Sequence, residues 1–210
     1  MSLLRTFIAV EIPSQVQKRI QEAVEPLHKE LGSSLIRWVP AQNIHITLKF
    51  LGDVSPANVE RLTQILRTEA DLVHAFELYM DGLGSFPNLR RPRVLFIGIQ
   101  SPAGLEALYH GIETACARLG YASEERRFSP HLTIGRVRVD IPASGQQKIR
   151  DALEKTMIDS PGIARVDSVH LYKSELKPTG STYTKLFSAP LNNNECHYKG
   201  RGPFNDIQPR

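Results

Sequence analysis

Two short segments of the chain carry the same pattern, in which a histidine and a threonine stand two residues apart within an apolar run. The two segments are Asn43-Ile44-His45-Ile46-Thr47-Leu48 and Pro130-His131-Leu132-Thr133-Ile134. Successive side chains of a β-strand point to opposite faces, so each segment predicts a strand with an imidazole and a hydroxyl on one face and aliphatic side chains on the other. Each strand therefore has one face to bury and one to leave open. Because the pattern occurs twice, the sequence predicts one site that holds a pair of histidines.

The elements expected around these two strands also repeat in the same order. Apolar periodicity and capping residues predict, in each half, a strand, a helix, a loop, the histidine strand, a second helix and a closing strand. The first half has strands near 7–12, 43–52 and 76–80, helices near 14–31 and from 55 onward, and a Gly/Pro loop at 82–92; the second has strands near 94–99, 130–134, 166–172 and 182–186, and helices near 101–119 and 144–156. This order predicts an α+β fold of two pseudo-symmetric lobes, each an antiparallel-rich sheet covered by helices, with a cleft between them.

The repeat accounts for residues 1–191, which we expect to form a single domain of two lobes. Residues 192–210 are polar, lack periodicity and contain Asn, Gly and Pro, so we expect a loose tail.

The composition is that of an ordinary soluble globular protein, with 41% hydrophobic and 23% charged residues. No apolar run approaches the roughly 20 residues of a membrane helix, and the first residues do not resemble a secretion signal. Cys116 and Cys196 are the only cysteines and are too far apart in sequence for a metal-binding spacing, so a reducing cytoplasm is the expected location. The net charge of +4 permits an anionic ligand but is too small to argue for non-specific duplex binding.

A pair of histidines suits the chemistry of phosphodiesters. One imidazole can take a proton from the attacking hydroxyl or water while the other gives one to the leaving oxygen, because imidazoles titrate near neutral pH. The hydroxyls of Thr47 and Thr133 lie beside the rings and can donate hydrogen bonds to phosphate oxygens. A metal site would call for a His-x-His pair or carboxylates at strand spacing, and neither motif has them. We therefore predict catalysis without a metal or any other cofactor.

The residues around both motifs resemble those of a known family. The chain is similar to the two-histidine (2H) phosphoesterases, specifically the LigT-like RNA 2′,3′-cyclic phosphodiesterases, once described as 2′-5′ RNA ligases. The resemblance covers roughly residues 5–191 and rests on Arg5–Val10, Trp38–Pro40, Asn43–Gly52, Ser129–Arg136, Leu171–Leu176, Pro178–Gly180 and Tyr183.

The resemblance implies hydrolysis of a 2′,3′-cyclic phosphate at an RNA end to a 2′-phosphate. It implies that His131 is the general base, that His45 is the general acid, and that Thr47 and Thr133 hold the phosphate. Arg136 matches the arginine of the family's His-x-Thr-x-x-Arg motif, which also contacts phosphate.

Strand alternation predicts which of the candidate phosphate-binding residues lie on the same face as the histidines. A regular strand would point Arg136 away from the histidine, although a bulge at Gly135 would re-aim it. By the same alternation Lys49 would face the cleft, which makes it a second candidate for phosphate binding. Phe50 and Tyr183 are candidates for stacking on unpaired bases. We expect an ordinary structural role for His170, which has no motif around it.

Two other functions stay open at this stage. The same acid and base could join RNA ends reversibly through a 2′-5′ linkage, and a nucleotide- or RNA-binding module without turnover would use the threonines and the arginine alone. In each case the expected partners are RNA ends or nucleotides rather than a membrane, and we expect a monomer.

Overall fold

A computed structural model of the chain describes residues 3–156, 158, 162–177 and 180–193. Its helices are α1 (Ser14–Leu35), α2 (Pro56–Asp71), α3 (Ala103–Arg118) and α4 (Ala143–Lys155), with a short 3₁₀ helix at Ala41–Asn43. Its strands are β1 (Leu4–Glu11), β2 (Ile36–Trp38), β3 (His45–Val54), β4 (Phe76–Phe86), β5 (Val94–Gln100), β6 (His131–Val137), β7 (Ile163–Val166), β8 (Ser168–Lys177) and β9 (Gly180–Pro190).

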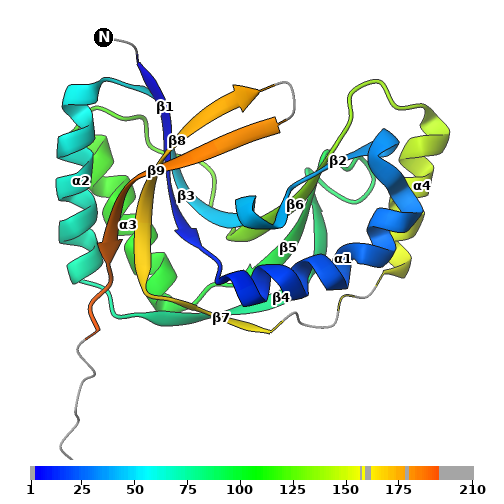
Figure 1. Ribbon diagram of the computed structural model, residues 1–210, viewed down its shortest axis with the longest axis horizontal. Coiled ribbons are helices and arrows are strands. Elements are labelled where there is room, and N and C mark those ends of the chain that lie inside the picture. Colours follow the sequence, from blue (N-terminus) through cyan, green and yellow to red (C-terminus); the bar gives the residue numbers. More distant parts are fainter. Residues whose placement is uncertain (1–2, 157, 159–161, 178–179, 194–210) are drawn as a thin grey trace, which may run out of the picture.

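The strands form two separate antiparallel sheets. One has the order β3-β1-β8-β9 and the other β2-β6-β5-β4-β7. Helices α2 and α3 pack together beside the four-stranded sheet, which we call the first lobe, and α1 and α4 pack together beside the five-stranded sheet, the second lobe (Figure 1). The expected α+β fold is confirmed, and each lobe contains one histidine strand, β3 in the first and β6 in the second.

The two halves of the sequence are intertwined, which the expected arrangement of one repeat per lobe did not include. Strand β4 closes the first repeat but pairs with β5 in the second lobe, and β8 closes the second repeat but pairs with β1 in the first lobe. The helices also cross over, since α1 contacts β2 and α3 contacts β3. Strands that follow each other in sequence commonly pair as antiparallel neighbours, and this favours β4 beside β5 over closure within the repeat.

The strands of the structure differ from the expected strands in the following ways. Strand β4 continues to Phe86 through part of the expected loop, because a bulge at Gly82 (φ +60°) absorbs the irregularity between Asp81 and Leu83. Strand β2 was not expected at all. The single strand expected over 166–172 is two strands, β7 and β8, which belong to different sheets.

The start of the expected tail is attached to the domain. Asn192 forms a parallel bridge with His74, and its backbone N–H donates to the carbonyl of Val73 at 2.9 Å. Residues 194–210 of the expected tail, with Cys196, lie outside the described residues. Among the described residues, no helix has the length and apolar character needed to cross a membrane.

Candidate active site

The two histidine strands have the same burial pattern. In β3 and in β6 the histidine and the threonine are half-buried, and the aliphatic residues that alternate with them are buried. The buried residues are Ile46 and Leu48 in β3 and Leu132 and Ile134 in β6. The predicted separation of a polar and an apolar face is therefore present in both strands.

Both strands also carry a bulge at the same position. Opposite β1, Thr47 pairs with Ala9 and Lys49 with Ile8, which leaves Leu48 as the extra residue. Opposite β5, Thr133 pairs with Phe96 and Gly135 with Leu95, which leaves Ile134 as the extra residue. A bulge adds one residue to one strand and so reverses the alternation beyond it.

The bulge in β6 returns Arg136 to the face of His131. Arg136 is exposed and pairs with Val94, and its charge acts on the imidazoles of both His45 and His131. The extra residue is Ile134, directly before the glycine at which the sequence predicted a bulge. In β3 the same device brings Phe50 to the face of His45, where its side chain is 72% exposed.

The bulge in β3 turns Lys49 away from the histidine face, so the expected phosphate contact of Lys49 is wrong. Lys49 is only 4% exposed, and its Nζ lies 2.7 Å from Oε2 of Glu113 on α3. The same nitrogen donates to the carbonyl of Ala122 at 2.8 Å. The prediction failed because simple alternation was extended through a bulge.

Both imidazoles are oriented in the same way. Nδ1–H of His45 donates to the carbonyl of Asn43 at 2.7 Å, and Nδ1–H of His131 donates to the carbonyl of Ser129 at 2.8 Å. A carbonyl oxygen can only accept, so each neutral ring carries its proton on Nδ1 and has its lone pair on Nε2. The Asn43 side chain also donates to the carbonyl of Ser181 in β9 at 3.0 Å, which ties this anchor to the β8–β9 hairpin.

The structure brings the two histidines within range of each other's charge. Burial lowers the pKa of His45, and the hydrogen bond to Asn43 acts against this shift, while His131 and Arg136 lower the pKa further. Burial also lowers the pKa of His131, again against its backbone hydrogen bond, with Arg136 adding to the shift. Both rings therefore release a proton more readily than a free imidazole, before an anionic substrate is considered.

The charges next to the two histidines differ. Glu11 is the cross-strand partner of His45, whereas Gly98 is the partner of His131. The Glu11 carboxylate raises the pKa of His45 and so offsets part of the lowering caused by burial. This carboxylate favours the protonated form of His45, whereas among the described residues no carboxylate shifts the pKa of His131.

Aromatic rings lie next to both histidines, and sequence reasoning missed most of them. Phe7 stacks on His45 with ring centroids 5.0 Å apart, and Tyr183 meets His45 edge-on at 5.3 Å. Phe86 and Phe96 lie 4.9 Å and 5.3 Å from the ring of His131. Of these, only Tyr183 was a candidate from the sequence. The phenylalanines come from neighbouring strands, and their position depends on strand pairing that one sequence does not display.

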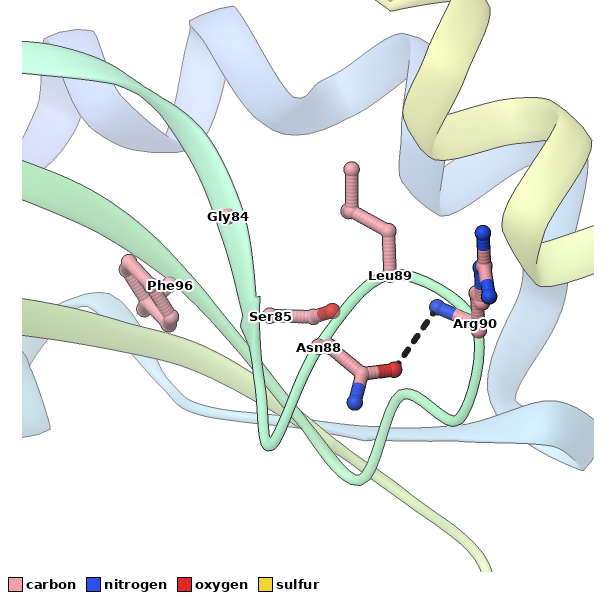
Figure 2. Close-up of a pocket in the computed structure, with 6 residues that line it drawn as sticks. All are labelled: Gly84, Ser85, Asn88, Leu89, Arg90 and Phe96. Atoms are coloured by element: carbon pink, nitrogen blue, oxygen red, sulfur yellow. Dashed lines mark hydrogen bonds between the residues drawn. The ribbon is translucent and has the colours of Figure 1, made fainter.

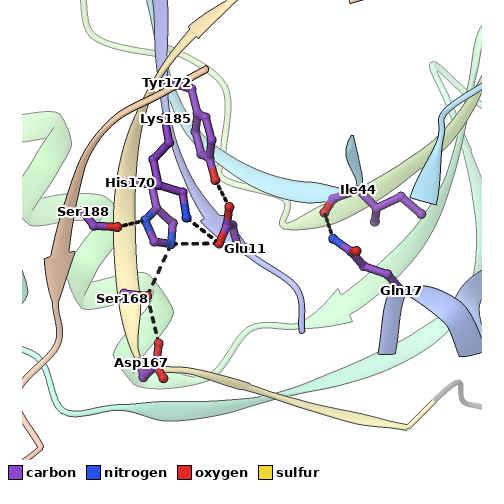
Figure 3. A network of polar contacts seen from close by, with 9 residues as sticks. All are labelled: Glu11, Gln17, Ile44, Asp167, Ser168, His170, Tyr172, Lys185 and Ser188. Carbon is purple, nitrogen blue, oxygen red and sulfur yellow. Dashed lines mark hydrogen bonds and ion pairs between the residues drawn. The ribbon is translucent and has the colours of Figure 1, made fainter. Parts of the chain in front are cut away.

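A polar network lies beside His45 on the first lobe (Figure 3). Glu11 accepts hydrogen bonds from Tyr172 and, at 2.8 Å, from Lys185. Nε2 of His170 lies 3.5 Å from Glu11, and its Nδ1 lies 2.5 Å from the hydroxyl of Ser188. Burial opposes ionisation of Glu11, but the bonds from Lys185 and Tyr172 outweigh it and lower the pKa of the carboxyl. His170 is 3% exposed, and we interpret it as a structural member of this network.

In the same region, Gln17 of α1 donates to the carbonyl of Ile44 at 3.4 Å, directly before His45 (Figure 3). This contact ties a helix of the second lobe to the histidine strand of the first.

A pocket of about 640 Å³ lies at the end of β4 and the loop that follows it (Figure 2). It is lined by Gly84, Ser85, Asn88, Leu89, Arg90 and Phe96. Phe96 belongs both to this pocket and to the surroundings of His131. Asn88 shapes the loop, since its Oδ1 accepts from the backbone N–H of Arg90 at 3.0 Å. The hollow is wide open to solvent, and none of the candidate site residues from the sequence lies in it.

A comparison with known protein families finds the same two-fold repeat in the chain. The model of the family described as LigT-like phosphoesterase matches the chain twice, over residues 10–96 and 97–183. Each match contains one of the two histidine strands, which confirms the duplication seen in the sequence.

Several curated relatives have the same name. The RNA 2′,3′-cyclic phosphodiesterase of Thermotoga maritima is 33% identical over 199 residues, which are 94% of this chain and 97% of that protein. The protein of the same name from Archaeoglobus fulgidus is 33% identical over 184 residues, or 87% of this chain and 98% of that protein.

Solved structures share the fold. The crystal structure of E. coli LigT complexed with 3′-AMP is similar with a TM-score of 0.71 and 27% identity, covering 91% of this chain and 99% of that one. The crystal structure of TT0787 from Thermus thermophilus is similar with a TM-score of 0.73 and 26% identity, covering 91% and 100%.

Proposed function

The chain belongs to the LigT-like phosphoesterase family, and we propose from this membership that it hydrolyses the 2′,3′-cyclic phosphate at RNA ends to a 2′-phosphate. The relatives that match over nearly their whole length are named for this reaction. The observation that carries the proposal is the pair of imidazoles, each anchored through Nδ1 and each with Nε2 available.

In the proposed mechanism His131 is the general base and His45 the general acid. Nε2 of His131 takes a proton from water, the water oxygen attacks phosphorus, the bond from phosphorus to the 3′-oxygen breaks, and Nε2–H of His45 protonates that oxygen. The assignment of the two roles follows the resemblance of the two motifs to those of the family. The Glu11 carboxylate raises the pKa of His45, but burial and the charges of His131 and Arg136 outweigh it and lower this pKa overall. The fixed Nδ1–H tautomer leaves Nε2 as the nitrogen that exchanges the proton.

The remaining site residues would hold the phosphate and the base. We propose that the hydroxyls of Thr47 and Thr133 and the guanidinium of Arg136 bind the non-bridging oxygens, where charge is held during displacement. The exposed ring of Phe50 would stack on a base, since unpaired bases stack on aromatic side chains. Tyr183, which packs edge-on against His45, would also contact the base, beside Phe50.

A hydrolysis assay with matched variants tests this function. The substrate is a dinucleotide that ends in a 2′,3′-cyclic phosphate, and the 2′-phosphate product is identified by chromatography. We expect His45→Ala and His131→Ala each to lower kcat/KM by a factor of about 10² to 10⁴, with unchanged circular dichroism. His110→Ala, at an exposed position on α3, is the histidine control and should keep wild-type activity. Residual activity within tenfold of wild type in either site variant would contradict the proposal.

The same assay separates the alternatives. Activity in the presence of EDTA is expected for metal-independent catalysis, and loss of activity on chelation would favour a metal site. RNA halves with 2′,3′-cyclic phosphate and 5′-hydroxyl ends would be joined by a 2′-5′ ligase, but the relatives favour hydrolysis. Tight binding of a nucleoside 2′-phosphate without any turnover would favour a binding module.

A further inference from the structure

Strand β2 places a second arginine, Arg37, next to Arg136, the arginine that we propose to bind phosphate. Arg37 and Arg136 are cross-strand partners in the β2–β6 pair, and both are exposed. Directly opposite residues of two antiparallel strands lie on the same face with Cβ atoms about 5 Å apart. Arg37 therefore stands on the histidine-bearing face, beside Arg136.

The other two residues of β2 confirm this orientation. Ile36 is fully buried, and the space on the apolar face of Gly135 is filled by Ile36 and Trp38. Residues on either side of Arg37 thus point toward the helix-covered face, which leaves the opposite face for Arg37.

The two guanidinium groups are not balanced by acidic side chains. Within the part of the chain that the structure describes, neither Arg37 nor Arg136 makes an ion pair or a side-chain hydrogen bond. Like charges directly opposite each other destabilise a pair of strands. An anion placed between them would remove this repulsion, and Arg binds phosphate oxygens through its planar fork of donors.

In the first lobe, several of the positively charged side chains form ion pairs. Three lysines of its sheet are paired with carboxylates, Lys49 with Glu113, Lys173 with Glu175 and Lys185 with Glu11, each at 2.7 or 2.8 Å. In addition, β3 is an edge strand of its sheet, whereas β6 has β2 outside it. Among the described residues, strand β2 thus places an unpaired arginine beside the histidine strand of the second lobe, and β3 has no such outer neighbour.

We propose that Arg37 binds a second phosphate, the phosphodiester that joins the terminal nucleotide to the rest of the RNA, while Arg136 contacts the cyclic phosphate that reacts. This inference rests on the proposed function and extends it to the choice of substrate. The enzyme would select an oligoribonucleotide end over a cyclic mononucleotide, because only the oligonucleotide carries the second phosphate.

The experiment compares two substrates that share the terminal nucleotide, 2′,3′-cyclic AMP and an oligoribonucleotide that ends in the same cyclic adenylate. The quantity measured is the ratio of kcat/KM for the oligonucleotide to kcat/KM for the mononucleotide. Loss of one charge-assisted phosphate contact is expected to lower this ratio about tenfold in Arg37→Gln. Arg61→Gln, at an exposed position of α2 in the first lobe, removes the same charge and should leave the ratio unchanged.

Binding provides a readout independent of turnover. The affinity for a fluorescent oligoribonucleotide with a 2′-phosphate end is measured by anisotropy over a series of salt concentrations. Arg37→Gln should weaken binding and reduce the salt dependence by about one phosphate contact.

The possible outcomes separate this inference from the proposed function. An unchanged ratio together with unchanged oligonucleotide affinity in Arg37→Gln would overturn the second phosphate site, as would an equal loss in Arg61→Gln, which would indicate attraction by net charge alone. Absence of hydrolysis of both substrates by the wild type would contradict the proposed function, and the anisotropy series would still decide whether Arg37 binds the RNA chain.

Discussion

The two lobes of this protein use one backbone device for two chemical purposes. In both, a strand begins at a histidine, continues to a threonine on the same face, and bulges at the next residue, so that the fifth residue after the histidine returns to the histidine face. That residue is the apolar ring of Phe50 in the first lobe and the cation Arg136 in the second. The backbone and its burial pattern have been kept, while the side chains it presents have diverged.

The same divergence is seen at two further positions. The fourth residue after the histidine is Lys49 in the first lobe, where it forms a buried ion pair. In the second lobe it is Gly135, which allows Ile36 and Trp38 of β2 to approach closely. The cross-strand partner of the histidine is Glu11 in the first lobe and Gly98 in the second. A duplicated fold thus supplies two imidazoles in equivalent positions, and their neighbours make them unequal.

The largest expected effect distinguishes the roles of the two histidines. An aryl phosphodiester such as bis-p-nitrophenyl phosphate releases an anion that needs no proton, so it makes the general acid dispensable. We expect His45→Ala to lose a factor of about 10² to 10⁴ on a cyclic nucleotide but to approach wild-type kcat/KM on the aryl ester. His131→Ala should lose activity on both substrates. The opposite pattern would exchange the two assignments.

The next effect concerns the stability of the first lobe. Lys49→Ala would leave the Glu113 carboxylate, whose side chain is 12% exposed, without its partner. Removing one member of a buried ion pair costs about 3 to 5 kcal/mol, and we expect a loss of this order in urea unfolding.

The double variant Lys49→Met with Glu113→Leu should recover most of that stability, because it removes both charges together. It should also hydrolyse the cyclic nucleotide at a rate close to wild type. A loss of more than a hundredfold in kcat/KM in the folded double variant would indicate that Lys49 contacts the substrate after all.

Much of this comparison could be predicted from the sequence, and the failures have physical causes. The strands, the position of the histidines and the duplicated order follow from local periodicity, which one chain displays. The reversal of Lys49 depends on a bulge, and the approach of Arg37 to Arg136 depends on the pairing of β2 with a strand almost 100 residues away. Pairing between distant segments leaves no local pattern, so Glu11, Phe86 and Phe96 were missed for the same reason.

A smaller effect is expected for Phe50, which in the first lobe has the position that Arg136 has in the second. Stacking of one base on an aromatic ring contributes about 1 to 3 kcal/mol, so Phe50→Ala should raise KM roughly tenfold or more for an RNA end. The stability should hardly change, because the ring is 72% exposed. Leu72→Ala, at a position 73% exposed, is the control for loss of a surface apolar side chain. An unchanged KM in Phe50→Ala would show that Phe50 does not stack on the substrate.

The smallest effect tests whether the charge beside each histidine sets its role. Glu11 raises the pKa of His45, so the neutral side chain of Glu11→Gln should let this pKa fall further below its usual range. A general acid must be protonated, and the alkaline limb of the pH profile of kcat/KM should therefore move to lower pH. The acidic limb, which reports the base His131, should stay in place. Glu175→Gln removes a lysine-paired carboxylate of the same sheet and should move neither limb. Movement of the acidic limb in Glu11→Gln would instead identify His45 as the base, and the asymmetry of the two lobes would then run in the opposite direction.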